Sequence, residues 1–313
     1  MKTFALLLIC IIAIVLASTF FIPSSSATTA PPYVTQWGSY GLGKLGQFAF
    51  PQSIAIDSSG NVYVTDLGNR RVEKFDFNGN FLDTWGTKGN DNGQFQAPVG
   101  IAVHGNSVYV VDNSQNLIQK FDTSGKFITS WGSKGSGDGQ FLLPQGIAVD
   151  PSGYVYVADP GNSRIDKFSS DGKFIKSIGQ SGLGNGQFLS PRAVAADSQG
   201  SIYVSDSGNN RIEKFTQDGV FLKTFAAASG SNLKTPLGLS VDSSGNIYIT
   251  DTGNDRIVKI DRDGNQLVSW GSQGTGADFF DNPRDITVDS AGNVYVVDSS
   301  KIGSRNLVLY LHQ

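Results

Sequence analysis

Short apolar runs alternate with clusters of turn residues along the chain after residue 30. In one stretch these runs are Ser53–Asp57, Val62–Asp66, Arg71–Asp76 and Phe81–Gly86. Asp, Asn and Gly stand between them. They favour turns because Gly adopts positive φ and because Asp and Asn side chains bond the local backbone. Runs of about five residues separated by turn residues predict β-hairpins. The pattern therefore predicts four short strands in succession and an all-β fold.

This pattern recurs six times along the chain. The string YVTDLGNRRVEKF at Tyr63–Phe75 returns as YVADPGNSRIDKF at Tyr156–Phe168. The other copies start at four tyrosines: Tyr109, Tyr203, Tyr248 and Tyr295. A proline precedes each copy, at spacings of 47, 46, 47, 45 and 47 residues: Pro51, Pro98, Pro144, Pro191, Pro236 and Pro283. A period in this range without a helical pattern is typical of propellers. We therefore expect six four-stranded blades, each packing its apolar face against the next.

The two ends of the chain predict how the ring closes. The last repeat stops at Leu311 after its third strand, with no fourth. Near the start, Tyr33–Gly38 (YVTQWG) matches the fourth strand Phe81–Gly86 (FLDTWG). We expect this N-terminal strand to complete the sixth blade, because that removes an open sheet edge. The predicted domain is a six-bladed β-propeller over residues 31–313.

These motifs resemble the NHL repeat over residues 33–311. The family pattern GQFxxPxGIAVD, followed by YVxDxGNxRI, is met by Gly139–Phe141, Pro144–Asp150 and Tyr156–Ile165. The resemblance implies a six-bladed propeller and is nearly silent on activity. Relatives in that family include ubiquitin-ligase tails, an amidating lyase and extracellular sensor domains of bacterial kinases. The lyase's zinc-binding histidines and catalytic methionine have no counterparts here, because the only methionine is Met1.

Residues 1–30 differ from the rest of the chain. Lys2 is their only charge, Phe4–Ile22 is almost wholly apolar, and Ser, Thr, Ala and Pro follow. This predicts a secretory signal peptide, with a cleavage site near Ala27 or Ala30. The apolar run is also just long enough to span a bilayer, so an uncleaved N-terminal membrane anchor is the alternative. Either reading places the propeller outside the cytoplasm, secreted or at the cell surface.

The amino-acid composition excludes several kinds of site in the propeller. The single cysteine, Cys10, lies in the N-terminal segment, so disulfides and cysteine-based sites are not expected. The two histidines, His104 and His312, are too few for a His₃ zinc site. Calcium needs six to eight oxygens, and each Asp-containing turn offers one carboxylate. We expect no metal and no cofactor. The whole chain carries 24 basic and 27 acidic residues, evenly mixed, which argues against nucleic acid as the main partner.

Strand alternation assigns the loops to two faces. The loops from second to third strand, such as Leu67–Arg70, share a face with those between blades, such as Thr87–Pro98. The opposite face holds only tight turns. Long loops on a rigid scaffold commonly carry binding sites. The residues after each proline begin the innermost strand, so we expect them to rim the central channel on the long-loop face.

The predicted rim differs from blade to blade. Its residue pairs are Gln52/Ser53, Val99/Gly100, Gln145/Gly146, Arg192/Ala193, Leu237/Gly238 and Arg284/Asp285. Because guanidinium groups suit carboxylates and other planar acceptors, we hypothesise a polar patch that recognises a carboxylate, sugar or peptide. Its candidate binding residues are Arg192, Arg284, Asp285, Gln52, Gln145, Asn113 and Lys301, the last two marking blades whose second loop departs from the repeat. The alternative is that the rim residues are merely solvated or bond loop carbonyls.

Four other features are interpreted as structural. The string at Gly41–Gly46 matches GxGxxG, but no helix follows it, so we read it as a connector. The tryptophans that share one repeat position are expected to pack between blades: Trp37, Trp85, Trp131 and Trp270. The repeated acid–arginine pairs are expected to hold loops in place: Asp66/Arg71, Asp159/Arg164, Asp206/Arg211, Asp251/Arg256 and Asp298/Arg305. His104 replaces the turn aspartate of the other blades and is read as a turn residue.

The sequence favours a non-catalytic binding module. It would present its long-loop face to an extracellular protein, peptide or glycan. The alternatives are a propeller enzyme acting at the channel mouth, such as a lyase or a lactonase-like hydrolase, or a structural component of the cell envelope. Propeller hydrolases typically hold a cation in a cage of Glu, Asp and Asn. Here the rim offers Asp285 beside two arginines, which repel a cation.

Overall fold

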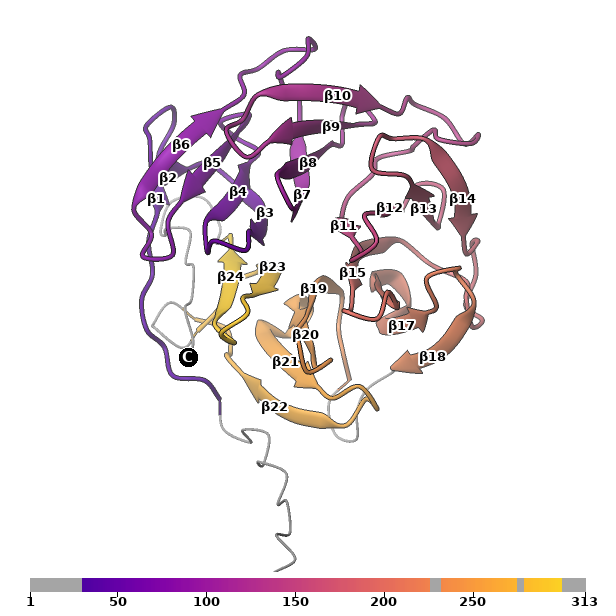
Figure 1. Cartoon of the computed structure of the whole chain (residues 1–313). Helices are drawn as coiled ribbons and strands as arrows, with labels where there is room; N and C mark the ends of the chain where they lie inside the picture. Colours follow the sequence, from indigo (N-terminus) through magenta and orange to yellow (C-terminus); the bar gives the residue numbers. More distant parts are fainter. Residues whose placement is uncertain (1–29, 226–231, 275–278, 300–313) are drawn as a thin grey trace, which may run out of the picture.

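The protein is a ring of β-sheets around a central channel (Figure 1). The computed structural model describes residues 30–225, 232–274 and 279–299. The predicted signal or anchor segment, but for residue 30, lies outside the described residues, as do Lys301 and the predicted third strand of the sixth blade. Within the described ranges no helix is long and apolar enough to cross a membrane.

Five blades are four-stranded antiparallel sheets whose strands run in order from the channel outwards. The first comprises β3 (Pro51–Ile56), β4 (Val62–Asp66), β5 (Arg71–Phe75) and β6 (Phe81–Trp85). The second comprises β7 (Pro98–His104), β8 (Ser107–Asp112), β9 (Leu117–Asp122) and β10 (Phe127–Trp131). The third comprises β11 (Ile147–Val149), β12 (Val155–Asp159), β13 (Arg164–Phe168) and β14 (Phe174–Ile178).

The fourth blade comprises β15 (Pro191–Ala196), β16 (Ile202–Asp206), β17 (Arg211–Phe215) and β18 (Phe221–Phe225). The fifth comprises β19 (Pro236–Val241), β20 (Ile247–Asp251), β21 (Arg256–Ile260) and β22 (Gln266–Trp270). Of the sixth blade the described strands are β23 (Pro283–Val288) and β24 (Val294–Asp298). A short parallel pair, β1 (Ser39–Tyr40) and β2 (Gln47–Phe48), precedes the first blade. Two 3-10 turns follow β16 and β20: η1 (Ser207–Asn209) and η2 (Thr252–Asn254).

The core lies between blades. The second strands are buried along their whole length because neighbouring sheets cover both faces, as β4 shows. The fourth strands form the rim of the disc and are only partly buried, as in β6. Aromatic rings fill the space between sheets, with Phe95 of the loop before β7 5.8 Å from Phe121 between ring centroids. Stacking of this kind explains why a single sheet is not stable alone and why the repeats must follow one another around a ring.

Trp37 occupies the place that fourth-strand residues hold in the other blades. Its ring meets Tyr295 of β24 edge-on, with 6.4 Å between centroids, and lies 6.5 Å from Phe75 of the first blade. Trp85 contacts a tyrosine of its own blade and a phenylalanine of the next in the same way. Tyr33 packs against the core between the fifth and sixth blades. The N-terminal segment therefore packs against the sixth blade, where the sequence places the closure; the third strand with which it is predicted to pair lies outside the described residues.

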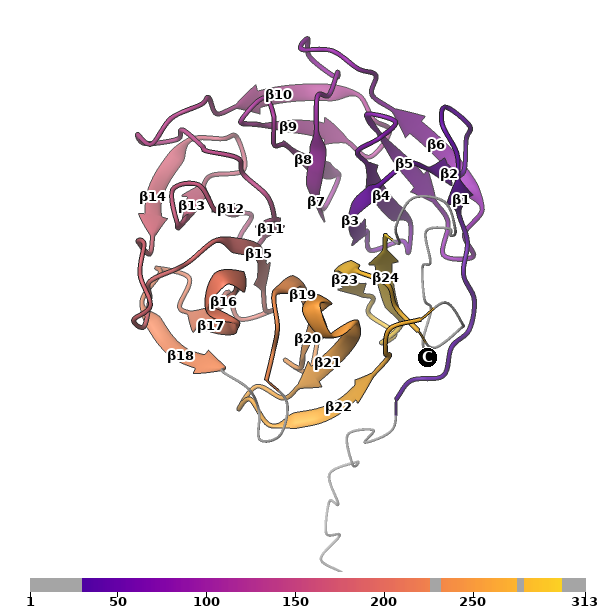
Figure 2. The ribbon, with the colours of Figure 1, turned by 180° about the vertical axis from the view of Figure 1, so that it is seen from behind.

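The two faces differ as the strand alternation predicts. On one face the β4–β5 loop is joined to the loop before the blade, since Asn69 Nδ2 donates to the carbonyl of Gly41 at 2.9 Å. On the other face the turns are tight: the side chain of Asp57 accepts the backbone N–H of Asn61 at 2.9 Å. Seen from behind, the same inner strands surround the channel (Figure 2). The GxGxxG string lies in the link between β1 and β2 and opens no helix, which confirms it as a connector.

Candidate binding site at the channel mouth

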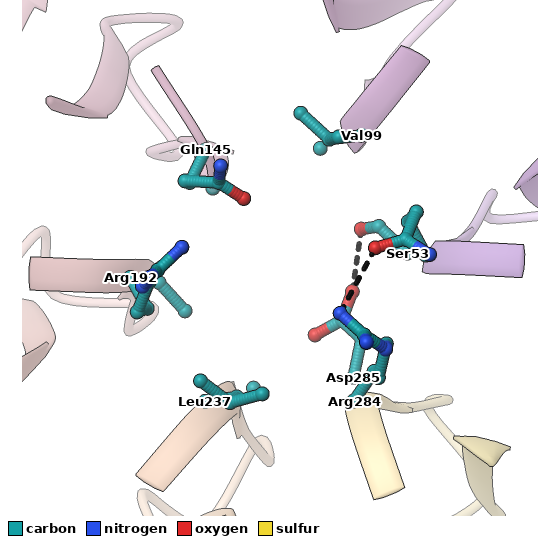
Figure 3. A pocket seen from close by; sticks show the side chains of 12 residues that line it. Ser53, Val99, Gln145, Arg192, Leu237, Arg284 and Asp285 are labelled. Atoms are coloured by element: carbon teal, nitrogen blue, oxygen red, sulfur yellow. Dashed lines mark hydrogen bonds between the residues drawn. The ribbon is translucent and has the colours of Figure 1, made fainter. Parts of the chain in front are cut away.

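The residue pairs that follow the six prolines line one cavity on the long-loop face, of about 80 Å³. Figure 3 shows these side chains arranged around the opening. The local cause is a bulge at the start of the inner strand. In the first blade Pro51 pairs with Asp66 and the ladder resumes only at Ile54 with Val64. The two residues between them leave the ladder, and bulges of this kind redirect side chains.

Two arginines dominate the cavity. Arg284 is held in place, because its Nε donates to Ser299 Oγ at 2.7 Å and its Nη1 to Gln52 Oε1 at 3.2 Å. The side chain of Arg192 makes no hydrogen bond or ion pair with any residue that the structure describes. Burial lowers the pKa of both guanidinium groups, and the positive charge of Arg192 lowers the pKa of Arg284 further. Both stay charged at neutral pH because an arginine pKa starts so high.

No carboxylate of the described residues lies within ion-pair distance of either guanidinium group. The nearest candidate by sequence, Asp285, is used elsewhere. Its carboxylate accepts the hydroxyl of Ser53 at 2.5 Å and the N–H of Ile54 at 3.1 Å. Burial raises the pKa of Asp285 to about 6, against these hydrogen bonds, which lower it. The mouth therefore carries two positive charges and a carboxyl group that is already bonded within the protein.

Asp285 acts as a link between the last blade and the first. Ser53 makes the equivalent link one blade further on, because its Oγ accepts the N–H of Ile101 at 3.2 Å. The carboxylate of Asp285 thus bonds the inner strand of a neighbouring blade rather than a loop carbonyl. The sequence could not show this, because the partner residues come from another blade.

The remaining candidates divide between the cavity and the scaffold. Gln52 and Gln145 line the cavity. Asn113 is not among the residues that line the cavity; its Nδ2 donates to the carbonyl of Pro144 at 3.0 Å across the seam between blades. The hydroxyl of Thr252 makes the same bond to the carbonyl of Pro283 at 2.6 Å. Lys301 lies outside the described residues. Sequence reasoning missed Ser299, which orients Arg284, since nothing in the repeat pattern distinguishes it.

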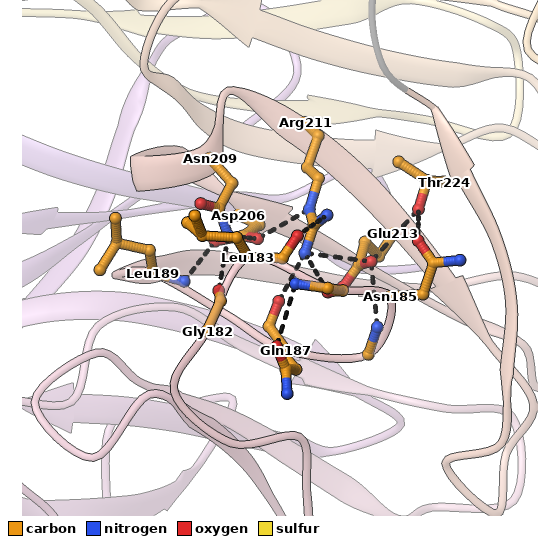
Figure 4. Close-up of polar contacts among 12 residues, drawn as sticks. Gly182, Leu183, Asn185, Gln187, Leu189, Asp206, Asn209, Arg211, Glu213 and Thr224 are labelled. Carbon is orange, nitrogen blue, oxygen red and sulfur yellow. Dashed lines mark hydrogen bonds and ion pairs between the residues drawn. The ribbon is translucent and has the colours of Figure 1, made fainter.

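The acid–arginine pairs hold the long loops, as predicted. In the fourth blade Arg211 Nε donates to Asp206 at 2.9 Å (Figure 4). Its two terminal nitrogens donate to the carbonyls of Leu183, Gly184 and Gln187 in the preceding loop. The other described pairs have Nε–Oδ2 distances of 3.7, 3.7 and 2.6 Å: Asp66/Arg71, Asp159/Arg164 and Asp251/Arg256. For the pair Asp298/Arg305, Arg305 lies outside the described residues.

Two further interpretations concern single residues. Trp85 packs against the neighbouring blade, 5.9 Å from the ring of Phe121, which confirms the packing role of the tryptophan position. The sequence predicts His104 as a turn residue, but it is the last residue of β7 and pairs with Ser107, so the turn itself is Gly105–Asn106. Among the described residues no three His, Cys, Asp or Glu side chains are grouped so that they could hold a metal ion.

A ring of radially arranged four-stranded sheets defines the class of β-propeller proteins. A family model described as the NHL repeat matches residues 48–75, 188–215 and 233–260. A second model, described as a 6-bladed beta-propeller, matches residues 88–165. The chain therefore contains NHL repeats and has a six-bladed propeller fold.

Known proteins share parts of this sequence or its fold. The chain is 32% identical over 92 residues to the protein brain tumor of Drosophila melanogaster, a stretch that covers 26% of this chain and 9% of that protein. Virginiamycin B lyase from Staphylococcus aureus has a similar structure, with a TM-score of 0.58 and 16% identity over 79% of this chain and 77% of that one. A gluconolactonase from Xanthomonas campestris has a TM-score of 0.61 and 17% identity, over 90% and 95% of the two chains. A chain of a nidogen/laminin complex has a TM-score of 0.59 and 19% identity, over 76% and 84%. Identities this low show a shared fold alone.

Proposed function

We propose that this protein is a binding module whose channel mouth accepts a carboxylate presented by an extracellular protein, peptide or glycan. One observation carries the proposal: Arg192 and Arg284 converge on one cavity without an ion-paired acid among the described residues. Placing two guanidinium groups near each other costs free energy through repulsion. A bound carboxylate offsets that repulsion and supplies charge-assisted hydrogen bonds.

The size of the cavity supports a presented group rather than a whole small molecule. Pockets that enclose a small-molecule ligand are usually about 300–1,000 Å³. The mouth offers about 80 Å³, which suits one carboxylate and the carbon atoms next to it. The rest of such a ligand would lie on the surrounding long loops or in the channel cavity of about 190 Å³, which shares Ser53 and Asp285 with the mouth. This arrangement favours a partner that covers the face and inserts one acidic group.

The similar structures include a lyase and a gluconolactonase, so an enzyme is the rival function. The twelve residues that line the mouth include a single carboxylate, Asp285, and neither His nor Cys. A cation site needs several oxygen ligands, and two guanidinium groups repel a cation. One of the similar structures is described as a catalytically inactive virginiamycin B lyase carrying a histidine-to-alanine change. The composition of the mouth lining is the observation that supports binding over catalysis here.

We place this function outside the cytoplasm, secreted or at the cell surface. The support is the apolar segment Phe4–Ile22, which reads as a signal peptide or an N-terminal anchor. Mass spectrometry of the protein recovered from the producing cells tests this step. A mature N-terminus near Ala27 or Ala30 indicates secretion, and an intact segment in the membrane fraction indicates anchoring. Recovery of the intact chain from the cytoplasm would contradict the placement.

The binding proposal is tested with matched charged and neutral probes. Saturation-transfer NMR compares glucuronate with glucose, and N-acetylglutamate α-amide with N-acetylglutamine α-amide. We expect the two carboxylates to bind, and Arg192→Ala or Arg284→Ala to reduce their affinity by about tenfold, since a lost charge-assisted hydrogen bond is worth about 1.5–3 kcal/mol. Arg262→Ala is the control, because Arg262 is exposed and bonds Ser244 on the tight-turn face. Equal binding of charged and neutral probes, or unchanged binding by both arginine variants, would overturn the proposal.

A further inference from the structure

Large apolar side chains are exposed beside the mouth, directly before the prolines that start the inner strands. Phe50 is 42% exposed, Leu143 is 51% exposed and Leu189 is 45% exposed. Phe50 and Leu143 each precede the proline of their blade, and Leu189 stands two positions before Pro191. The residue after each of those prolines lines the cavity. These three apolar residues therefore belong to the long-loop face, next to the mouth.

The backbone conformation makes two of them unusual. The position before the proline has positive φ in five blades: Phe50 at 67°, Leu143 at 60°, Ser190 at 61°, Thr235 at 48° and Asn282 at 85°. The scaffold thus imposes a left-handed conformation there. Asn suits that conformation, whereas Phe and Leu are disfavoured in it. Phe50 and Leu143 also stay exposed to water, so neither conformation nor burial explains them. Strained residues with no structural benefit point to a role in binding.

The three side chains lie on more than one side of the mouth. Phe50 comes just before β3 of the first blade, and Leu189 comes just before β15 of the fourth (Figure 1). The first and fourth blades stand opposite each other in the ring, with the channel between them. Leu143 belongs to the third blade, beside the fourth. Apolar contacts are therefore available on both sides of the two arginines.

We propose that the long-loop face binds an extended segment of a partner protein in which an internal Asp or Glu is flanked on both sides by apolar side chains. The acidic side chain enters the mouth between Arg192 and Arg284, and the flanking side chains lie on Phe50 and on Leu143 with Leu189. This inference rests on the proposed function and names its ligand. Charge complementarity selects the acidic residue. Apolar contacts on both sides of the mouth require that the partner segment continues in both directions from that residue.

An internal acidic residue fits better than a terminal carboxylate. A chain that ended in the mouth would leave one side of the apolar surroundings uncovered. In an extended segment, side chains alternate between faces, so residues two positions before and after the acid point the same way as the acid. Such a segment covers both sides of the mouth while only one side chain descends into the cavity. Large exposed apolar groups next to a polar centre are typical of protein interaction sites.

Fluorescence anisotropy with labelled peptides tests this inference. The probe is a capped peptide, acetylated and amidated, with Glu at its centre and Leu two positions to each side. Three comparison peptides carry Gln at the centre, Ser at both flanks, or a free C-terminal carboxylate in place of the central Glu. We expect the probe to bind at least about tenfold more tightly than each of the three, which corresponds to about 1.4 kcal/mol. A preference for the free C-terminus would overturn the choice of an internal acid.

Protein variants locate the apolar contacts without disturbing the fold. Phe50→Asn and Leu143→Asn introduce the residue that the sixth blade has in the same conformation, Asn282. We expect both variants to melt at or above the wild-type temperature and to bind the probe about tenfold more weakly. Phe77→Asn is the control, because Phe77 is 56% exposed and lies in the β5–β6 turn on the opposite face. Weakening by this control to the same extent would contradict a site at the mouth.

The outcomes separate this inference from the proposed function. Equal affinity for the Leu-flanked and Ser-flanked peptides would overturn the apolar contacts and leave the carboxylate site in place. Equal affinity for the Glu and Gln peptides would overturn both. Sedimentation velocity of the free protein provides the remaining check. A dimer that dissociates on Phe50→Asn would show that a second copy covers this face, which contradicts a partner peptide.

Discussion

At the scale of single residues, buried carboxylates on the third strands decide how stability responds to pH. Glu73 is fully buried, and its Oε1 pairs with Arg71 Nη2 at 2.7 Å and accepts the N–H of Gly46 at 3.2 Å. Its Oε2 has no hydrogen-bond partner among the described residues. Burial raises the pKa of Glu73 to about 7, although the Arg71 charge lowers it. The second blade has Gln119 at this position, donating to the carbonyl of Gln94 at 2.7 Å.

Glu73→Gln tests this effect. In the folded protein Glu73 holds its proton up to about pH 7. In the unfolded chain the same carboxyl group loses its proton at an ordinary glutamate pKa. The folded state therefore binds more protons between these values, and the contribution of Glu73 to stability falls as pH rises through that window. Urea unfolding of the wild type and of Glu73→Gln from pH 5 to pH 8 measures this change in the free energy of unfolding. The wild type should lose on the order of 2 kcal/mol relative to Glu73→Gln, since one pKa unit is worth about 1.4 kcal/mol. If the free energies of unfolding of the two proteins changed with pH in parallel, Glu73 would have an ordinary pKa in the folded protein.

At the scale of the elements, the long loops before the first, third and fourth blades are tied by an arginine from the third strand behind them: Arg71, Arg164 and Arg211. Arg211 ties the loop before β15 by three bonds to carbonyls and is paired with Asp206 and Glu213. Both acids are fully buried, so they need this positive charge. The second blade has no such ion pair between the first and third residues of its third strand, because Leu117 and Gln119 replace the arginine and the glutamate.

Arg211→Ala should destabilise the fold by about 3 kcal/mol or more, because it leaves two buried acids unpaired. The double change Arg211→Leu with Glu213→Gln copies the second blade and should recover much of that loss. Chemical denaturation measures both effects, and amide hydrogen exchange at residues 180–187 reports loosening of the loop. If the double variant is no more stable than the single one, the acid at position 213 is not the source of the cost.

Much of the element scale follows from the repeat. The strand bounds predicted for the first blade agree with β4 and differ from β3, β5 and β6 only at their ends. The faces of the loops and the residues around the mouth also follow, because alternation and proline position are local properties. The hydrogen bonds between neighbouring blades do not follow from the repeat pattern. Asn113 looks like a loop variant in the sequence, yet it reaches Pro144 of the next blade. The sequence offers no register between blades from which this contact could be predicted.

At the scale of the whole molecule, stability depends on the N-terminal segment that closes the ring. Trp37 contacts Tyr295 in the last described blade and Phe75 in the first. It therefore joins two parts of the chain that are far apart in sequence. A propeller without this contact would leave the rings of Tyr295 and Phe75 without one of their packing partners.

Trp37→Ala should cost about 3 kcal/mol or more, as large-to-small changes in a packed aromatic core do. Trp85→Ala is the matched comparison, because Trp85 makes the corresponding contacts between the first and second blades. Urea unfolding of both variants gives the two costs. Similar losses, each in one cooperative transition, are expected. A negligible loss for Trp37→Ala beside a large one for Trp85→Ala would show that the closure contributes little.

The sequence by itself determined the blade count, the strand order, the closing segment and the residues that surround the mouth. Each of these follows from local periodicity, since strand alternation and turn chemistry act over a few residues. Only the tertiary structure decided which of those residues remain available to a ligand. Asp285 is bonded to Ser53, 232 residues away, whereas Arg192 has no partner among the described residues. The physical reason is that hydrogen bonds between blades depend on distances set by ring closure, which no single repeat contains.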